Sequence, residues 1–253
     1  NKIIYNSKFN NPNVLIAGCG TGKHAHHSTS YKNSNILAID LSLSSLAYAK
    51  RKTEELDYKN IEYLHADILQ LKKLNKKFDI IECAGTLHHM EDPIKGLKIL
   101  LDILEPHGYL KLALYSETAR QHVVKARELI NKKNLKNIDE DIKNFRQDVM
   151  NEKVDQLLKK VSLNTDFYST STVRDLLFHV QEHRFTIPQI SKILHDLDLE
   201  FLGFVFDKDN IKKEFLKSFP KDINNISLDN WHQFELNNPD IFVGMYQFWL
   251  KKK

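Results

Sequence analysis

Hydrophobic and polar residues follow two different patterns along this chain, and the change falls near residue 115. Up to that point, short apolar runs alternate with longer segments that carry a single apolar stripe. The short runs predict β-strands over residues 14–17, 36–40, 61–65, 78–83 and 109–115. The segments over 42–56 and 94–104 predict amphipathic helices. Strands and helices that alternate in this way favour right-handed crossovers and a parallel sheet.

The rest of the chain is predicted to be mostly helical before it returns to strands. Helices are predicted over 117–134, 139–150, 152–161, 171–180 and 187–197. Residues 164–171 are expected to form a loop between two of them, and Pro188 suits the first turn of the last. Beyond them, the pattern predicts a strand over 199–206, a helix over 209–219 and an aromatic-rich strand over 241–250.

These elements predict an α/β fold of the doubly wound class, with a helical segment inserted between the fifth and sixth strands. Residues 1–115 and 199–253 are expected to form the sheet domain. Residues 116–198 are expected to form a helical cap that sets substrate specificity. A chain of 253 residues with 42% hydrophobic residues is long enough to build one such domain with an insertion.

A glycine-rich loop follows the first strand, in "VLIAGCGTGKHAHH". Gly18, Gly20 and Gly22 carry no Cβ, so a ligand can approach their backbone closely. A helix is expected to start near Gly22 and to direct its free N–H groups at the same ligand. Doubly wound folds bind nucleotides in this way, but the dinucleotide pattern requires glycine where this chain has Lys23, and the P-loop pattern also fails. A tight turn is the alternative for this loop taken alone.

Acidic and small residues stand at the ends of the next strands. Asp40 ends the second strand, where a carboxylate can accept hydrogen bonds from ribose hydroxyls. Asp67 follows the third strand, within reach of an adenine amino group. Cys83, Ala84 and Gly85 end the fourth strand and are small enough to lie under a ligand. Each acid can instead cap a helix, but four such features at four successive strand ends favour a shared ligand.

The segments "VLIAGCGTG", "LAIDLS", "HADI", "FDIIECAGTLHHMEDP" and "LEPHGYLKLALYS" together resemble the class I S-adenosylmethionine-dependent methyltransferases. The resemblance covers residues 13–115 in order. It implies a Rossmann-like sheet of seven strands with the last antiparallel, S-adenosylmethionine as cofactor and S-adenosylhomocysteine as product. By this resemblance the glycines contact the methionine part, Asp40 the ribose, and Asp67 with Ile68 the adenine. The full implied set of cofactor-binding residues is Gly18, Cys19, Gly20, Gly22, His24, Asp40, Leu41, Asp67, Ile68, Cys83, Ala84 and Gly85.

Two further segments carry more specific resemblances. "LHHMEDP" is similar to the branch that includes quinone and other small-molecule methyltransferases. "DFYSTSTVRDLLFHVQEHRFTIPQI", residues 166–190, resembles a segment of bacterial methyltransferases of poorly defined substrate, some of which follow tetratricopeptide repeats. Because the chain begins with Asn1 rather than Met, an upstream segment is expected, and a repeat domain is one candidate for it.

Methyl transfer is an in-line displacement, so the enzyme's main task is to orient the acceptor, and a base is needed only when the acceptor arrives protonated. The acceptor is expected above the carboxyl ends of the fourth and fifth strands. The predicted catalytic residues there are His88, Tyr115, Arg120 and His122. Of the adjacent pair His88 and His89, one is expected to face the ligand and the other to pack. Arg120 can clamp a carboxylate or phosphate of the acceptor, or it can form an ordinary ion pair on a helix.

Substrate contacts are predicted for six more residues, His89, Tyr168, Ser169, Arg174, His179 and His183. His179 and His183 stand at the i, i+4 spacing of a zinc pair, but the sequence shows no third ligand, so no metal is predicted. A polar helix end that faces the acceptor is the preferred interpretation of this pair. His24 is expected to pack beside the glycine loop.

Composition and charge limit the partners and the cellular location that the sequence predicts. The net charge is +4 and no segment holds a basic block, so charge does not indicate a nucleic-acid partner. No apolar run reaches the length of a membrane helix and no secretory signal is visible, so a membrane partner is not expected. Two cysteines suggest reduced thiols and a cytoplasmic location. Cys19 and Cys83 are expected to lie near each other under the cofactor as packing residues.

Three functions remain open at this point. The first is a methyltransferase that acts on a small molecule, including an acidic one, beneath a helical cap. The second keeps the cofactor but takes a protein side chain or an RNA as acceptor. The third is a cofactor-binding partner subunit without catalysis, and the intact glycine loop and Asp40 argue against it.

Overall fold

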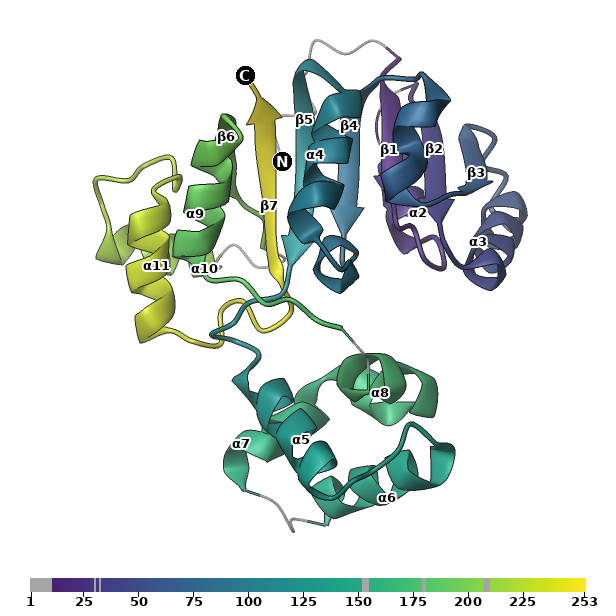
Figure 1. The fold of residues 1–253 in the computed structure, drawn as a ribbon. Helices are drawn as coiled ribbons and strands as arrows, with labels where there is room; N and C mark the ends of the chain where they lie inside the picture. The colour runs from purple at the N-terminus through teal and green to yellow at the C-terminus, as the bar shows by residue number, and fades with distance from the viewer. Residues whose placement is uncertain (1–10, 30, 32, 152–154, 179–180, 207–209) are drawn as a thin grey trace.

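The computed structural model describes residues 11–29, 31, 33–151, 155–178, 181–206 and 210–253 (Figure 1). A seven-stranded sheet forms its centre, in the order β3-β2-β1-β4-β5-β7-β6. Its strands are β1 (Asn13–Ala17), β2 (Asn35–Asp40), β3 (Ile61–His65), β4 (Phe78–Ala84), β5 (Leu104–Leu114), β6 (Leu199–Phe204) and β7 (Tyr246–Lys252). Only β7 pairs with its neighbours in the antiparallel sense. The predicted α/β fold, with seven strands and an antiparallel last strand, is therefore confirmed.

Helices cover both faces of the sheet, and the strands are apolar on both sides for that reason. Leu15 and Leu37 belong to one hydrophobic core, whereas the adjacent residues Val14 and Ile36 belong to the core on the other face. The covering elements are α2 (Lys23–Ser28), α3 (Leu43–Glu55), η1 (Ile68–Leu74), η2 (Leu87–His89), α4 (Pro93–Ile103), α9 (Ile187–Asp196), α10 (Asn210–Ser218) and α11 (Leu228–Asn237).

The inserted segment forms a helical subdomain with its own core. It consists of α5 (Gln121–Lys132), α6 (Asp139–Met150), α7 (Gln156–Lys159), η3 (Lys160–Leu163), η4 (Thr165–Tyr168) and α8 (Thr170–Leu177). Phe145, Val161 and Phe167 are buried together in this core. In Figure 1 the subdomain lies beyond the carboxyl ends of the parallel strands. Its role as a cap over an acceptor stays a prediction.

The structure differs from the predicted elements in two places that matter for the site. Helix α9 was grouped with the cap, but Ile187, Ile190 and Leu194 pack in the sheet core. Helix α11 was not predicted at all, although Ser227 caps its first turn and Trp231 and Phe234 bury one side of it. As a result, β7 begins at Tyr246 rather than at residue 241, because the preceding residues connect α11 to the sheet.

Candidate functional site

A cavity of about 440 Å³ lies at the carboxyl edge of the sheet, beside the ends of four successive strands. Most of the predicted cofactor-binding residues line it: Gly18, Cys19, Gly20, His24, Asp40, Leu41, Asp67, Ile68, Ala84 and Gly85. Because the carboxyl ends of parallel strands share one edge, residues far apart in sequence meet here. Among the described residues, none from the helical subdomain lines this cavity.

The glycine loop presents bare backbone to the cavity. Gly18 and Gly20 have φ angles of 79° and 51°, in the left-handed region that favours glycine. A Cβ on Gly18 would overlap the side chain of Thr86, whereas a Cβ on Gly20 would find no atom within 4 Å. Gly20 therefore leaves open the space that a ligand would occupy.

Gly22 has a different role from the one implied by the resemblance. It does not line the cavity, and a Cβ there would lie 2.8 Å from Cβ of Ala49 on α3. Its φ of 94° also requires glycine. Gly22 thus allows the loop to pack closely against α3 and supports the site indirectly.

Asp40 connects the loops after β1 and β2. Its Oδ2 accepts a hydrogen bond of 2.7 Å from the Gly20 N–H, and its Oδ1 accepts one of 2.8 Å from the Ser42 N–H. Asp67 accepts a hydrogen bond of 2.8 Å from the Leu69 N–H and so caps η1. Asp67 therefore caps a helix, as the alternative interpretation expected, and it also lines the cavity. Helix capping does not prevent Asp67 from contacting a ligand.

The two cysteines occupy different environments. Cys19 lines the cavity and packs with the core that contains Val14, whereas Cys83 is fully buried in the core on the opposite face of the sheet. The prediction that both lie together under the ligand is therefore wrong for Cys83. Burial raises the pKa of each thiol to about 12. Both thiols stay protonated at neutral pH and act as packing groups.

The adjacent histidines diverge as expected: His89 lines the cavity and His88 packs in the interior. His88, the predicted catalytic residue, is fully buried and stacks on Tyr115 with ring centroids 3.6 Å apart. His89 lines the cavity beside Gly85 and Met90. Burial also raises the pKa of Tyr115. The structure therefore places His89, rather than His88 or Tyr115, at the cavity wall.

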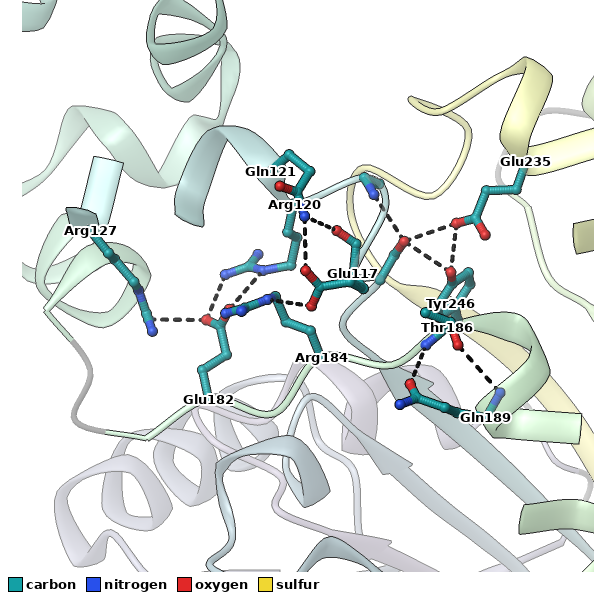
Figure 2. Close-up of polar contacts among 12 residues, drawn as sticks. Glu117, Arg120, Gln121, Arg127, Glu182, Arg184, Thr186, Gln189, Glu235 and Tyr246 are labelled. Carbon is teal, nitrogen blue, oxygen red and sulfur yellow. Dashed lines mark hydrogen bonds and ion pairs between the residues drawn. The ribbon is translucent and has the colours of Figure 1, made fainter. Parts of the chain in front are cut away.

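Arg120 belongs to an ionic cluster with Glu182 (Figure 2), and it does not line the cavity. Its Nε and Nη2 donate to the two carboxylate oxygens of Glu182 at 3.2 and 2.8 Å. Its guanidinium also lies 3.5 Å from the ring centroid of Tyr115. The side chains of Arg120 and Glu182 are 3% and 1% exposed. Glu182 therefore accepts the two hydrogen bonds that Arg120 was predicted to donate to a carboxylate or phosphate of the acceptor. The prediction that Arg120 binds the acceptor is wrong.

The other predicted acceptor residues lie away from the cavity. His122 is buried on α5, where burial lowers its pKa, and lines a separate pocket with Leu163 and Gly244. Ser169 caps α8, Arg174 pairs with Asp139 at the surface, and Tyr168 is exposed. The His183 N–H donates to the His88 carbonyl. His179 lies outside the described residues.

Other residues that line the cavity were missed by the sequence analysis, chiefly Thr21, Lys23, Ala66, Thr86 and Met90. All of them are immediate neighbours of predicted residues. The signal was present in the motifs "GCGTGK", "HADI" and "AGTLHHM", because a loop that wraps a ligand exposes consecutive residues to it.

A second buried network lies where β5 meets the helical subdomain. Oε1 of Glu235 accepts hydrogen bonds from Ser116 Oγ at 2.9 Å and from the Tyr246 hydroxyl at 2.6 Å (Figure 2). Burial raises the pKa of Glu235 above its usual value of 4.5. The folded state therefore binds this proton more tightly than the unfolded state does.

This raised pKa predicts a pH-dependent stability. The contribution of Glu235 is fully present below pH 4.5 and is lost as the pH rises through the raised pKa. We expect Glu235→Gln to remove this dependence, so that the free energy of unfolding of the wild type declines relative to the variant between pH 4.5 and neutrality. Urea denaturation across that range measures it. Parallel curves for the two proteins would contradict the prediction.

Among the residues that the structure describes, no group of three or more metal-ligating side chains is found. No helix in the described part of the chain is both long and apolar enough to span a bilayer.

A family model described as "Methyltransferase domain" matches residues 8–200, and the chain belongs to this family. The class I recognition, the enzyme class and S-adenosylmethionine as cofactor are thereby confirmed. Among curated proteins, the chain is 35% identical over 121 residues to an uncharacterized protein of Synechococcus sp., covering 47% of this chain and 29% of that protein. It is 25% identical over 111 residues to the ubiquinone biosynthesis O-methyltransferase of Acinetobacter baylyi, and the match covers 44% of this chain and 46% of that protein.

A solved structure supports the fold. PKMT2 from Rickettsia typhi, determined in complex with AdoHcy, matches with a TM-score of 0.70 and 18% identity, over 94% of this chain and 48% of that one. At that identity the likeness shows the fold alone. The matches span less than half the length of each of these relatives.

Proposed function

We propose that this chain transfers the methyl group of S-adenosylmethionine to a small acceptor molecule. The observation that carries the proposal is the cavity at the carboxyl edge, where the bare backbone of Gly20 and the carboxylate of Asp40 meet. Bound there, the cofactor supplies an electrophilic methyl group on a sulfonium. The name of the Acinetobacter baylyi relative, an O-methyltransferase of ubiquinone biosynthesis, supports a small acceptor.

The residues of the cavity suit the parts of this cofactor. The open space over Gly20 accommodates its amino-acid portion, and the Gly20 N–H stands beside it. Asp40 is the hydrogen-bond acceptor for the ribose hydroxyls, and Asp67 with Ile68 borders the adenine position. Gly85, Thr86, His89 and Met90 line the same cavity from the segment that follows β4, and we take this to be the side where the acceptor would approach.

The structure does not support the prediction, made from the sequence, that the acceptor carries an acidic group. That expectation rested on Arg120, whose guanidinium Glu182 already neutralises inside the protein. Among the described residues that line the cavity, Lys23 is the one lysine or arginine. The proposal therefore specifies a small acceptor without requiring a negative charge on it.

The test is incubation with S-adenosylmethionine labelled on the methyl group and a cell extract that is then separated by size. We expect label in the small-molecule fraction. Label in the protein or RNA fraction would replace the proposal with the macromolecular alternative. Cofactor binding without label in any fraction would favour the non-catalytic partner subunit.

Asp40 provides a prediction on cofactor affinity. In Asp40→Ala the ribose loses its charged acceptor, and the Gly20 and Ser42 N–H groups lose theirs. One hydrogen bond to a charged group contributes about 1.5–3 kcal/mol, so the loss of one such bond to the ribose should lower affinity for S-adenosylhomocysteine roughly tenfold to a hundredfold. Calorimetry measures it, with Asp57→Ala on the exposed surface as the control. Equal affinities for the two variants would contradict the assignment.

A further inference from the structure

An extended segment, residues 181–186, links α8 to α9 and runs across the carboxyl ends of β4 and β5; we refer to it as the strap. The His183 N–H donates to the His88 carbonyl at 2.8 Å, and the Phe185 N–H donates to the Tyr115 carbonyl at 2.9 Å. The Phe185 carbonyl also accepts a hydrogen bond of 2.8 Å from the Glu117 N–H. The strap is thus fixed to the loop that follows β4 and to the chain that follows β5.

Glu182 anchors the strap to the helical subdomain (Figure 2). Its carboxylate is 1% exposed and accepts hydrogen bonds from Arg120 and, at 3.0 Å, from Nη2 of Arg127. Nη1 of Arg184 lies 3.6 Å from its Oε1. A buried carboxylate that faces three guanidinium groups has one preferred position, because any displacement leaves buried charge uncompensated.

The residue beside Glu182 contacts the cavity wall. Nδ1 of His89 lies 3.1 Å from the carbonyl oxygen of Gln181. A carbonyl oxygen can only accept a hydrogen bond, so in the neutral imidazole Nδ1 must carry the proton. The lone pair of the neutral ring is then at Nε2. His89 lines the cavity together with Gly85, Thr86 and Met90.

We propose that Glu182 is a positioning residue for methyl transfer: it holds the Gln181 carbonyl against Nδ1 of His89, and so keeps Nε2 of His89 as the proton acceptor at the acceptor side of the cavity. This inference rests on the proposed function. Glu182 itself reaches neither the cavity nor the reacting atoms, and it acts through the strap.

The arrangement limits the class of acceptor. A general base serves a reaction in which the attacking atom arrives protonated, as in an alcohol or a phenol. When such a hydroxyl attacks, an O–CH₃ bond replaces the S–CH₃ bond and the electron pair of the broken bond remains on sulfur. The hydroxyl proton passes to Nε2 of His89, so the positive charge of the sulfonium ends on the imidazolium. A general base would also serve a thiol or an ammonium group, and the name of the Acinetobacter baylyi relative, an O-methyltransferase, favours a small molecule with a hydroxyl group.

The tautomer of His89 can be measured without knowing the acceptor. Ring ¹⁵N NMR of the ¹⁵N-histidine-labelled chain with S-adenosylhomocysteine distinguishes Nδ1–H from Nε2–H, and the signal lost in His89→Gln assigns the residue. We expect wild-type His89 to be predominantly the Nδ1–H form. A predominant Nε2–H form in the wild type would overturn the proposal before any variant of Glu182 is needed.

Glu182→Gln then tests the anchor, since it keeps the shape of the side chain and removes its charge. We expect the Nδ1–H form to lose its predominance in this variant, while affinity for S-adenosylhomocysteine stays at the wild-type level. Gln189→Ala is the matched control, because Gln189 binds the other end of the strap through the Thr186 N–H at 2.8 Å but does not contact the ionic cluster. It should leave the tautomer unchanged. A folded Glu182→Gln protein with the wild-type tautomer would overturn the positioning role.

The labelled-cofactor assay completes the test. His89→Gln should reduce label transfer to small molecules by about 10²–10⁴-fold, the usual contribution of a general base, with cofactor affinity retained. If wild type transfers label and His89→Gln transfers it equally well, the inference fails and the proposed function stands. If wild type transfers no label to small molecules, the proposed function fails, whatever the tautomer.

Discussion

Gly20→Val should lower the affinity of this chain for S-adenosylmethionine by at least about a hundredfold. The φ of 51° at Gly20 strains any residue with a Cβ, and a β-branched one most, at a cost of about 1–3 kcal/mol. The valine methyl groups would also enter the space over the loop, where the glycine leaves no atom within 4 Å of a Cβ position. If the loop relieves this strain by moving, it leaves the shape that meets the ligand, so the strain then lowers affinity in the same direction as the steric exclusion. Calorimetry with S-adenosylhomocysteine measures the result.

Gly244→Val is the matched control for this substitution. Gly244 likewise has no atom within 4 Å of a Cβ position, but its φ lies outside the left-handed region and it does not line the cofactor cavity. It should bind the cofactor with wild-type affinity. Undiminished affinity in a folded Gly20→Val protein would show that the ligand does not cross this backbone, and the placement of the cofactor would be wrong.

The sequence predicted the sheet well, and also the meeting of the strand-end residues at one cavity, because both depend on short-range patterns. Apolar runs mark parallel strands that are buried on both faces, and the residue after each run must lie at the carboxyl edge. Gly18, Asp40, Asp67 and Gly85 each follow such a run, and all four line the cavity. Positions at strand ends can therefore be assigned without any knowledge of tertiary contacts.

The acceptor side was predicted poorly, because it depends on contacts between distant parts of the chain. Arg120 is 62 residues before the carboxylate that neutralises it, and no local pattern indicates that Glu182 is buried. The choice between His88 and His89 depended in the same way on Tyr115, whose ring stacks on His88. Adjacent residues point in different directions on any element, so the sequence showed that they diverge but not which one faces the ligand.

The ionic cluster predicts an unequal response to the loss of its members. Glu182→Met leaves three guanidinium groups around an apolar side chain, and we expect it to destabilise the chain by about 3–5 kcal/mol. Arg120→Met leaves Glu182 with Arg127 at 3.0 Å and Arg184 at 3.6 Å, so its cost should be smaller, about 1–3 kcal/mol. Urea denaturation of both variants against the wild type measures the free energies of unfolding.

The double variant Arg120→Met/Glu182→Met separates the ion pair from the packing of its parts. Both charges of the most buried pair are then absent, and Arg127 and Arg184, at 18% and 24% exposed, can turn their remaining charge toward water. We therefore expect the double variant to be more stable than the sum of the single effects predicts, by roughly 1–3 kcal/mol. Additive losses would mean that Glu182 is held by its backbone and packing rather than by Arg120. The strap would then keep its position without the charge that we regard as its anchor.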